Sequence, residues 1–383
     1  MQNTARMITV KEVGTRKEQK AFLDFPLDLY AGNPCFVPPL YMDEKKIFRP
    51  DYVYKDSCDY TCFLAWKDGV VAGRIQAIIQ KAANEKNHER RARFCRFDAV
   101  DDFEVSKALF EAAEKWALER GMDTVCGPLG FSDLEREGLL VEGFDQTATF
   151  EENYNAPYYQ EHIERLGYTK EVDWVGFRLY GAADEETMTE MVQLKDFIFR
   201  RYKLHFGPSR NGKDFLARYA DGIFQLIDTS YEDLYGTVPF TEGMKKLMLD
   251  NFSLVVSPKY TAVVLDENDR VVCFGISFPA LAEALSGGRG HLTPKTAWKL
   301  LSAIRRPKAL DLCLVGVDPE YLNRGVSAAF SVALMQMFRD NPEIRFADTN
   351  LNLEDNYAIL NQWRRFRHEQ VKHYRAYVKK LSF

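Results

Sequence analysis

The sequence predicts an α/β (α+β) chain made of two similar halves, each with a mixed, mainly antiparallel sheet flanked by helices. The length of 383 residues is roughly 2.5 times the ~150 residues of a typical domain, which favours two domains. Short β-rich runs are joined by turn sequences, as in hairpins. A strong amphipathic helix is predicted in each half, at Phe103–Gly121 and at Arg324–Arg339.

The first half is predicted to be residues 1–180. Lys67-Asp68-Gly69 separates two β-rich runs and so predicts a hairpin, and Gly121 ends a helix because glycine adopts the left-handed conformation that follows many helices. The predicted strands are 7–13, 61–66, 70–80, 93–98, 123–126 and 168–180, and the predicted helices are 16–30, 103–121 and 156–166.

The second half is predicted to be residues 181–383, with a small, acidic linker at Gly181–Glu186. The predicted helices are 186–205, 214–226, 241–252, 324–339 and 354–366, and the predicted strands are 259–265, 270–278, 311–317, 345–349 and 370–381. A helical insertion is predicted at 279–308, with Gly287-Gly288-Arg289-Gly290 as a flexible hinge. The insertion is locally basic. It could attract an anionic acceptor, a ribose phosphate or a membrane surface, or it could be an ordinary solvated face.

Composition disfavours several classes of protein. The net charge of −5 argues against a nucleic-acid binder, and the six histidines show no metal-binding spacing. The seven cysteines are scattered and several lie in apolar runs, so we expect buried thiols in a reducing cytosol. The first 25 residues carry no signal-like apolar stretch, and Val326–Phe338 is too short to span a membrane. We therefore expect a soluble, cytoplasmic protein without a metal or integral membrane association.

One stretch of the second half carries site chemistry. Leu312–Val317 is an apolar strand that leads through a tight loop, Asp318–Ser327, into a helix. Unpaired backbone N–H groups and the peptide dipoles make a helix N-terminus a place for phosphate or pyrophosphate. Gly325 would allow close approach of the backbone, and Arg324 adds a cation. An ordinary strand–loop–helix connection also fits this spacing.

The phrase VDPEYLNRGVSAAF resembles the acyl-coenzyme A motif of the Gcn5-related N-acetyltransferase (GNAT) superfamily, V-x-P-x-Y-[QR]-x-x-G-x-[GA]. The resemblance implies that the loop backbone binds the pyrophosphate and that the preceding strand pairs with the pantetheine arm. The coenzyme contacts that it implies are Val315, Val317, Asn323, Arg324, Gly325, Val326, Ser327 and Ala328. Two positions depart from the motif, because Leu322 replaces its Gln or Arg and Ser327 replaces its second glycine.

Other segments extend the resemblance to nearly the whole chain. NLEDNYA at 352–358 is similar to the family's next motif, and FLAWKDGVVAGRI in the first half resembles the family's second and third strands. The first half lacks a coenzyme loop, since Ala99–Asp102 contains no glycine and two carboxylates, which would repel a pyrophosphate. The whole chain looks like a bacterial group of tandem GNAT-like proteins.

Acyl transfer to an amine needs a base and a proton donor for the departing thiolate. In this superfamily the donor is often a tyrosine about seven residues after the motif asparagine, but from Asn356 that count reaches Trp363. Tyr357 is the nearest phenol, and Asp348 and Glu354 are the candidate bases. Each of the three could instead have a purely structural role.

The resemblance implies an acyl-CoA-dependent N-acyltransferase that acetylates a primary amine of a small molecule or peptide, with the C-terminal half catalytic. Acetyl-CoA or another acyl-CoA would be the co-substrate. One alternative is a ligand-binding or regulatory protein that kept the scaffold and lost the chemistry. Another is a transferase with a long acyl or aminoacyl donor. The sequence does not indicate the acceptor or the oligomeric state.

Overall fold

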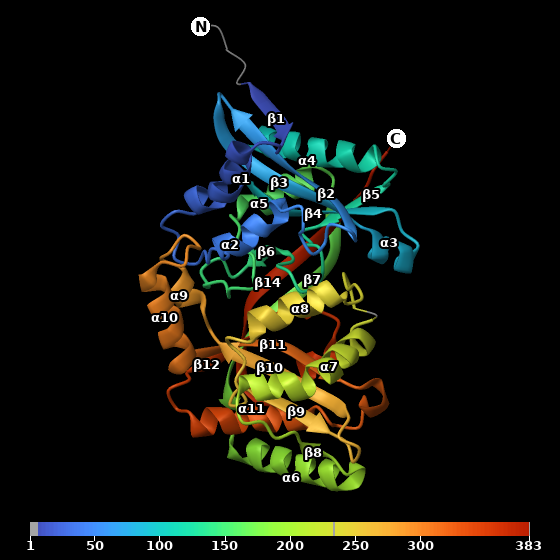
Figure 1. Ribbon diagram of the computed structural model, residues 1–383, viewed down its shortest axis with the longest axis vertical. Helices are drawn as coiled ribbons and strands as arrows, with labels where there is room; N and C mark the ends of the chain where they lie inside the picture. Colours follow the sequence, from blue (N-terminus) through green and yellow to red (C-terminus); the bar gives the residue numbers. More distant parts are fainter. Residues whose placement is uncertain (1–6, 233, 383) are drawn as a thin grey trace. The chain divides into compact units, whose positions relative to one another are not determined.

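The computed structural model describes residues 7–232 and 234–382, which form two compact units (Figure 1). The first unit comprises residues 7–174, 285–296 and 372–382, and the second comprises 175–284 and 297–371. The predicted boundary between 180 and 181 falls inside strand β7 (Thr169–Ala182), which both units share. The predicted linker at 181–186 is wrong, because β7 runs to Ala182 and helix α6 (Glu185–Tyr202) starts directly after its N-cap, Asp184.

The first unit is built on a sheet in the order β1-β2-β3-β4-β5-β14. Its strands are β1 (Ile8–Glu12), β2 (Cys58–Lys67), β3 (Val70–Gln80), β4 (Arg91–Ala99), β5 (Thr124–Gly127) and the end of β14 (Phe366–Lys380), with the short β6 (Leu139–Glu142) beside β14. β4 and β5 are parallel, whereas β1–β2, β2–β3, β3–β4 and β5–β14 pair antiparallel. The helices are α1 (Arg16–Leu29), α2 (Tyr41–Glu44), η1 (Lys45–Phe48), α3 (Lys81–Asn87), α4 (Phe103–Leu118) and α5 (Tyr158–Arg165).

Helix α4 covers the core of the first unit. Its apolar residues recur every three or four positions, so Leu109, Phe110 and Trp116 share one buried face against the sheet. The C-terminal strand is held to β7 by a buried ion pair, in which Asp173 accepts hydrogen bonds from Arg375 at 2.7 and 2.9 Å. Burial alone would raise the pKa of the Asp173 carboxyl, but the hydrogen bonds from Arg375 and neighbouring cations hold it well below its usual value.

The second unit is built on a sheet in the order β7-β12-β11-β10-β9-β8. Its strands are the end of β7, β8 (His205–Phe206), β9 (Thr261–Leu265), β10 (Val271–Pro279), β11 (Ala309–Val317) and β12 (Phe346–Thr349), with β13 (Asn352–Leu353) and the start of β14. β11 and β12 are parallel, whereas β10–β11, β9–β10, β7–β12 and β8–β9 pair antiparallel. The helices are α6, α7 (Gly212–Ser230), α8 (Glu242–Phe252), α9 (Ala282–Leu285), α10 (Pro294–Arg305), η2 (Pro319–Tyr321), α11 (Ala328–Asp340) and α12 (Tyr357–Trp363).

The predicted fold class is therefore confirmed: each unit has a mixed, mainly antiparallel sheet with helices around it. The helical insertion at 279–308 contains α9 and α10. All seven cysteines are buried free thiols, as predicted. Within residues 7–232 and 234–382, no helix is both long and apolar enough to cross a membrane.

The glycine-rich part of the insertion is not a free hinge, because it packs within the first unit. The Gly290 carbonyl accepts a hydrogen bond from the Tyr41 backbone N–H at 2.9 Å, and a Cβ at position 290 would lie only 2.1 Å from the Pro39 carbonyl oxygen. Arg289 pairs with Asp28 at 2.7 Å. The close backbone approach that glycine permits serves here to anchor the segment.

Candidate active site

The strand that leads into the predicted coenzyme loop contains a β-bulge. In the pairing of β10 with β11, one step from Ile276 to Ser277 is matched by two steps from Leu314 to Leu312, so Cys313 is an extra residue. The parallel pairing of β11 with β12 ends at the same point, at Leu312 and Thr349. Beyond the bulge, β11 runs on to Val317 with β10 along one side. Past the end of β12, the described residues place no strand on that side of β11, although the Val315 carbonyl already accepts a hydrogen bond from the Tyr231 hydroxyl.

The loop after β11 has free backbone donors. Helix α11 begins at Ala328, later than the predicted Arg324, because Asn323 and Gly325 have positive φ angles of 61° and 78° that no α-helix contains. Among the hydrogen bonds of the described residues, none uses the N–H of Asn323, Gly325, Val326 or Ser327 as donor. The Ser327 side chain does not cap the helix.

The surroundings of this loop fix its shape and add a cation. Arg324 is exposed, and its guanidinium carbon lies 5.6 Å from the ring centres of both Tyr202 and Tyr321. At the loop's start, Asp318 accepts hydrogen bonds from the Glu320 N–H at 2.8 Å and from Arg270 at 2.7 Å. Free N–H groups, an uncapped helix N-terminus and a neighbouring arginine together suit a phosphate or pyrophosphate.

In the equivalent loop of the first unit, the chain itself provides hydrogen-bond partners for the polar groups. The Asp102 carboxylate accepts a hydrogen bond from the Glu104 N–H at 3.0 Å, caps α4 and forms an ion pair with Lys67. The Ala99 N–H donates to the Tyr159 hydroxyl at 2.7 Å, and the Val100 N–H donates to the Ala72 carbonyl at 2.9 Å. The Asp102 carboxylate therefore satisfies the N-terminus of α4 from within the chain.

The strand edge of the first unit is also occupied by the chain itself. The pairing of β4 with β5 ends at Arg93, and the next carbonyl, that of Phe94, accepts a hydrogen bond from the Leu129 N–H at 2.8 Å. Further along β4, Arg96 adopts a φ of 46° and makes a two-pronged ion pair with Glu44, each contact 2.9 Å long. Burial raises the pKa of Glu44, but Arg96 outweighs burial and lowers that pKa to about 2.

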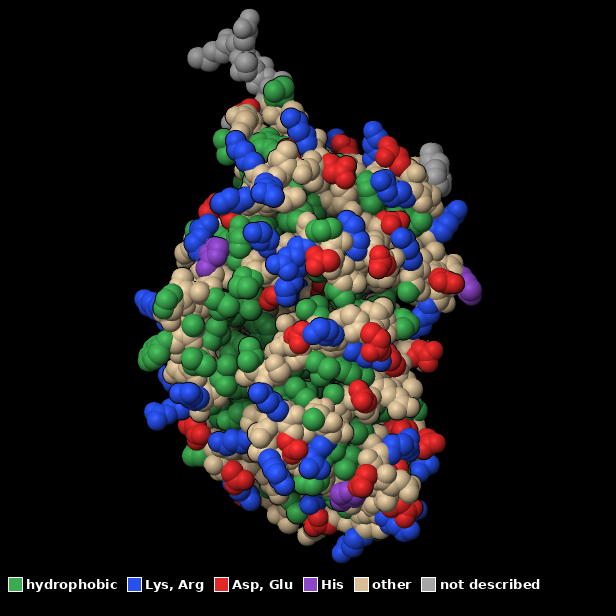
Figure 2. All heavy atoms as spheres, in the orientation of Figure 1, with side chains coloured by type: hydrophobic (Ala, Val, Ile, Leu, Met, Phe, Trp, Pro, Cys, Tyr) green, Lys and Arg blue, Asp and Glu red, His purple; other side chains and the backbone are tan. Residues whose placement is uncertain are grey.

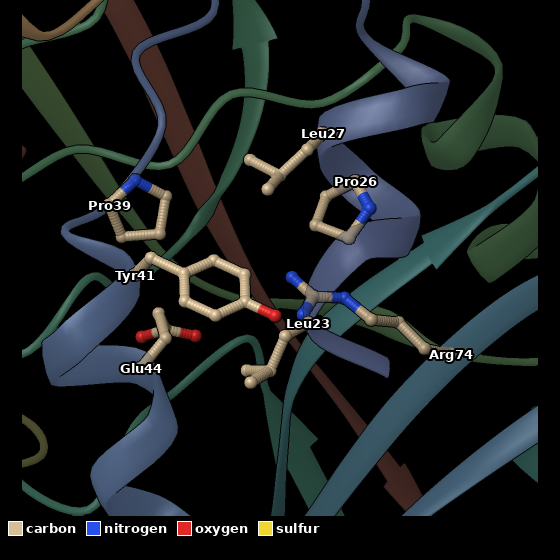
Figure 3. Close-up of a pocket in the computed structure, with 7 residues that line it drawn as sticks. All are labelled: Leu23, Pro26, Leu27, Pro39, Tyr41, Glu44 and Arg74. Carbon is tan, nitrogen blue, oxygen red and sulfur yellow. The ribbon is translucent and has the colours of Figure 1, made fainter. Parts of the chain in front are cut away.

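A small pocket lies beside Glu44 (Figure 3). Pro39, Tyr41 and Glu44 form one wall, and side chains of α1 form the opposite wall. The enclosed space is only about that of one water molecule, far less than an organic ligand needs. The Glu44 carboxylate is already paired with Arg96, so the pocket offers no free charge from that residue.

The predicted catalytic residues lie in different environments. Tyr357 opens α12 with its side chain 66% exposed, and Glu354 is exposed shortly before it. Asp348 is buried in β12 and accepts hydrogen bonds from Arg178 at 2.7 and 2.9 Å. Its carboxylate is therefore already paired with a side chain of the neighbouring strand β7. Trp363 is buried and donates to the Asn352 side chain at 3.3 Å. The catalytic roles of Tyr357, Asp348 and Glu354 stay predictions.

Sequence reasoning did not identify Tyr231. This residue follows α7, and its hydroxyl donates a 2.9 Å hydrogen bond to the carbonyl of Val315, two residues past the bulge. No motif marks the tyrosine, because it lies more than eighty positions earlier in the chain than the strand that it contacts. The local alternation of apolar residues around β11 could not have indicated it.

Several solved structures with a similar arrangement are described as GNAT proteins. A tandem GNAT protein from the clavulanic acid biosynthesis pathway matches 98% of this chain and 99% of its own at a TM-score of 0.56 and 11% identity. The chain has the tandem GNAT fold. A GCN5-related N-acetyltransferase from Sphaerobacter thermophilus matches 97% of this chain and 95% of its own, with a TM-score of 0.50 and 11% identity. The GNAT fold is one that supports N-acyltransferase activity, and its recognition from the sequence is confirmed at the level of fold.

Two curated proteins are similar in sequence over most of their length. Protein YghO of Escherichia coli (strain K12) is 28% identical over 375 residues, which cover 96% of this chain and 94% of YghO. A bacterial ceramide synthase of Caulobacter vibrioides is 27% identical over 346 residues, which cover 87% of this chain and 86% of that protein. No family model matches the sequence.

Proposed function

We propose that this tandem GNAT-fold protein is an acyl-CoA-dependent N-acyltransferase whose second unit binds the coenzyme at residues 317–328. The observation that carries this proposal is the contrast between the two loops. The N–H groups of Asn323, Gly325, Val326 and Ser327 have no acceptor in the described chain, whereas Asp102 fills the corresponding place in the first unit. A pyrophosphate supplies the acceptors that the second loop lacks.

The reaction forms a C–N bond and breaks a C–S bond. The acceptor nitrogen attacks the thioester carbonyl, the nitrogen gives up a proton to a base, and the thiolate leaves and takes up a proton. Backbone N–H groups along β11 beyond the bulge could polarise the thioester carbonyl, and holding donor and acceptor together supplies much of the rate. Tyr357 and Tyr231 are the candidate proton donors, and Glu354 is the candidate base with an exposed carboxylate.

The similarity to the bacterial ceramide synthase favours a second, narrower candidate function. Making a ceramide joins a fatty acyl group to the amine of a long-chain base, which is N-acylation. The similarity to the bacterial ceramide synthase extends over 86% of that protein, so a fatty acyl donor and a long-chain amine acceptor are the first pair to test against acetyl transfer. This second candidate thus specifies both the acyl group, a fatty acyl chain, and the acceptor, a long-chain amine.

Calorimetric titration of the full chain with acetyl-CoA and with a long-chain acyl-CoA tests the proposal. Gly325→Ala adds a methyl group to the loop, where its Cβ would lie 2.9 Å from Ile198 Cδ1. Gly121→Ala is a matched control, because Gly121 has the same φ of 78° and nothing within 4 Å of an added Cβ. Both variants should lose about 1–2 kcal/mol of unfolding free energy through left-handed strain, but only Gly325→Ala should weaken coenzyme binding.

Turnover is then measured as the release of free thiol from each acyl-CoA, with a long-chain amine and a small polar amine as acceptors. Thiol release that needs the amine and is weakened in Gly325→Ala supports the transferase. Folded wild-type protein that binds neither acyl-CoA would overturn it and leave a non-catalytic protein on a transferase scaffold. If Gly325→Ala binds acyl-CoA as tightly as the wild type, the coenzyme does not bind at residues 317–328.

A further inference from the structure

Helix α10 (Pro294–Arg305) places large apolar side chains in water. Trp298 is 70% exposed and Leu301 is 54% exposed, and Leu292, just before the helix, is 49% exposed. Thr296 is the buried residue of this helix. A helix of a globular protein normally buries its apolar stripe against a core, so exposed tryptophan and leucine on one helix need another explanation.

The exposed side chains are sorted around the helix axis. At about 100° per residue, Trp298, Leu301 and Arg305 fall within an arc of roughly 60°. Lys295 and Lys299 fall on the neighbouring part of the surface, between about 60° and 100° from Trp298. The helix thus carries two exposed apolar side chains with Arg305 between them, next to a strip with Lys295 and Lys299. Figure 2 shows green hydrophobic and blue basic side chains side by side at the left edge, where Figure 1 places α10.

The charge of this segment is opposite to that of the chain. Between Glu283 and Asp311 the sequence has no acidic residue, whereas the whole chain has a net charge of −5. The basic residues of this interval are Arg289, Lys295, Lys299, Arg305, Arg306 and Lys308. Arg289 pairs with Asp28, but in the described part of the chain the other five form no ion pair. Their charge is available to an external anion.

The segment that leads into α10 is fixed at its start. The Gly290 carbonyl accepts a hydrogen bond from the Tyr41 N–H, and the centres of the His291 and Tyr41 rings lie 4.3 Å apart. Leu292 and the first turn of α10 follow directly from this anchor. The anchor orders the residues that lead into the helix, so that these have little conformational freedom to lose when the helix binds.

We propose that helix α10 forms a docking surface for an anionic phospholipid bilayer. The helix lies in the plane of the interface, with Trp298 and Leu301 entering the boundary between headgroups and acyl chains. Lys295, Lys299 and Arg305 contact lipid phosphates. Basic residues alone would suit any polyanion. The adjoining strip with an exposed tryptophan is what selects a bilayer, because apolar burial is available there. This binding is separate from the proposed acyl transfer and needs no turnover.

Co-sedimentation of the full chain with vesicles tests the proposal. We expect binding to vesicles of phosphatidylcholine with one quarter phosphatidylglycerol at low salt, and at least tenfold weaker binding to phosphatidylcholine alone. Trp298→Ser with Leu301→Ser should weaken binding to the anionic vesicles tenfold or more. Leu254→Ser is the matched control, since Leu254 is 78% exposed elsewhere in the second unit and its loss should change nothing.

Lys295→Gln with Lys299→Gln should also weaken binding severalfold and reduce its salt dependence. Circular dichroism and thermal melting show whether each variant is folded. We expect folded variants, because the substituted side chains are exposed or only partly buried. The proposal is overturned if the wild type does not bind anionic vesicles, or if Leu254→Ser loses as much as the α10 variant. It is also overturned if heparin or RNA binds as tightly as the vesicles and the apolar variant keeps full affinity, which would mark a general polyanion site.

Discussion

Replacing Ser327 by aspartate should stabilise the protein and yet weaken its binding of acyl-CoA. Ser327 precedes α11 with φ −58° and ψ −21°, which is helical geometry, so an aspartate there cannot form the usual cap hydrogen bond of an extended N-cap residue. The new carboxylate still interacts favourably with the N-terminal end of the helix dipole. That interaction contributes about 0.3–1 kcal/mol to the free energy of unfolding.

The same carboxylate opposes a bound pyrophosphate. Two unit negative charges roughly 5 Å apart repel by about 1 kcal/mol at an effective dielectric constant near 80 and by about 3 kcal/mol near 20. The affinity for acyl-CoA should therefore fall roughly five- to 150-fold. Stability and affinity move in opposite directions, which separates this effect from damage to the fold.

Urea unfolding and calorimetric titration of the same preparations provide the two readouts. Thr241→Asp is the control, because Thr241 already caps α8 by accepting a hydrogen bond from Met244, and the change places the same charge at another helix N-terminus of the second unit. The control should keep its acyl-CoA affinity. Equal affinity of wild type and Ser327→Asp would refute the placement of the pyrophosphate, and so would an equal loss in both variants.

Three further outcomes follow from the structure. Arg324→Ala should weaken acyl-CoA binding by about 1 kcal/mol at low salt, and titrations at rising ionic strength should show the difference shrinking; a difference that is constant with salt would contradict an electrostatic contact. Tyr231→Phe removes the donor to the Val315 carbonyl, which should cost about 1 kcal/mol of stability. It should also tighten acyl-CoA binding, because the freed carbonyl can pair with the pantetheine arm. Weaker binding would contradict this pairing and would mean that the hydroxyl itself holds the ligand. The folded pKa of Asp173 lies below its unfolded value, so its stabilisation is present above about pH 4 and is lost as the pH falls further. Asp173→Asn should therefore cost about 3 kcal/mol at pH 7 and about 1 kcal/mol less at pH 3 in urea unfolding, because one proton changes stability by at most about 1.4 kcal/mol per pH unit. An equal cost at both values would contradict the ion pair with Arg375.

Local patterns predicted the hairpins and the main helices well because turn chemistry and side-chain periodicity are properties of neighbouring residues. Lys67-Asp68-Gly69 does join β2 to β3, and the apolar repeat does mark α4. The start of α11 was predicted four residues too early, because periodicity does not report the positive φ angles of Asn323 and Gly325. Those two angles create the loop with free N–H groups, so the error concerned the site itself.

Partners that are distant in the chain were beyond sequence reasoning. Nothing near Gly290 indicates that its carbonyl meets Tyr41, and nothing near Val315 indicates Tyr231. The ion pair between Asp348 and Arg178 likewise depends on how β7 lies against β12. Such contacts depend on tertiary packing, which a single sequence does not encode in any short window.

The allocation of residues 285–296 and 372–382 to the first unit has a consequence for synthesis of the chain. On a ribosome, residues 7–174 emerge first, but their sheet lacks the strand that pairs with β5 until Tyr377–Lys380 have left the exit tunnel. The first unit must wait for β14, with the β5 edge unpaired while the second unit is translated. A stop codon before residue 372 would therefore leave the N-terminal half aggregation-prone, although every residue of its first long segment is intact.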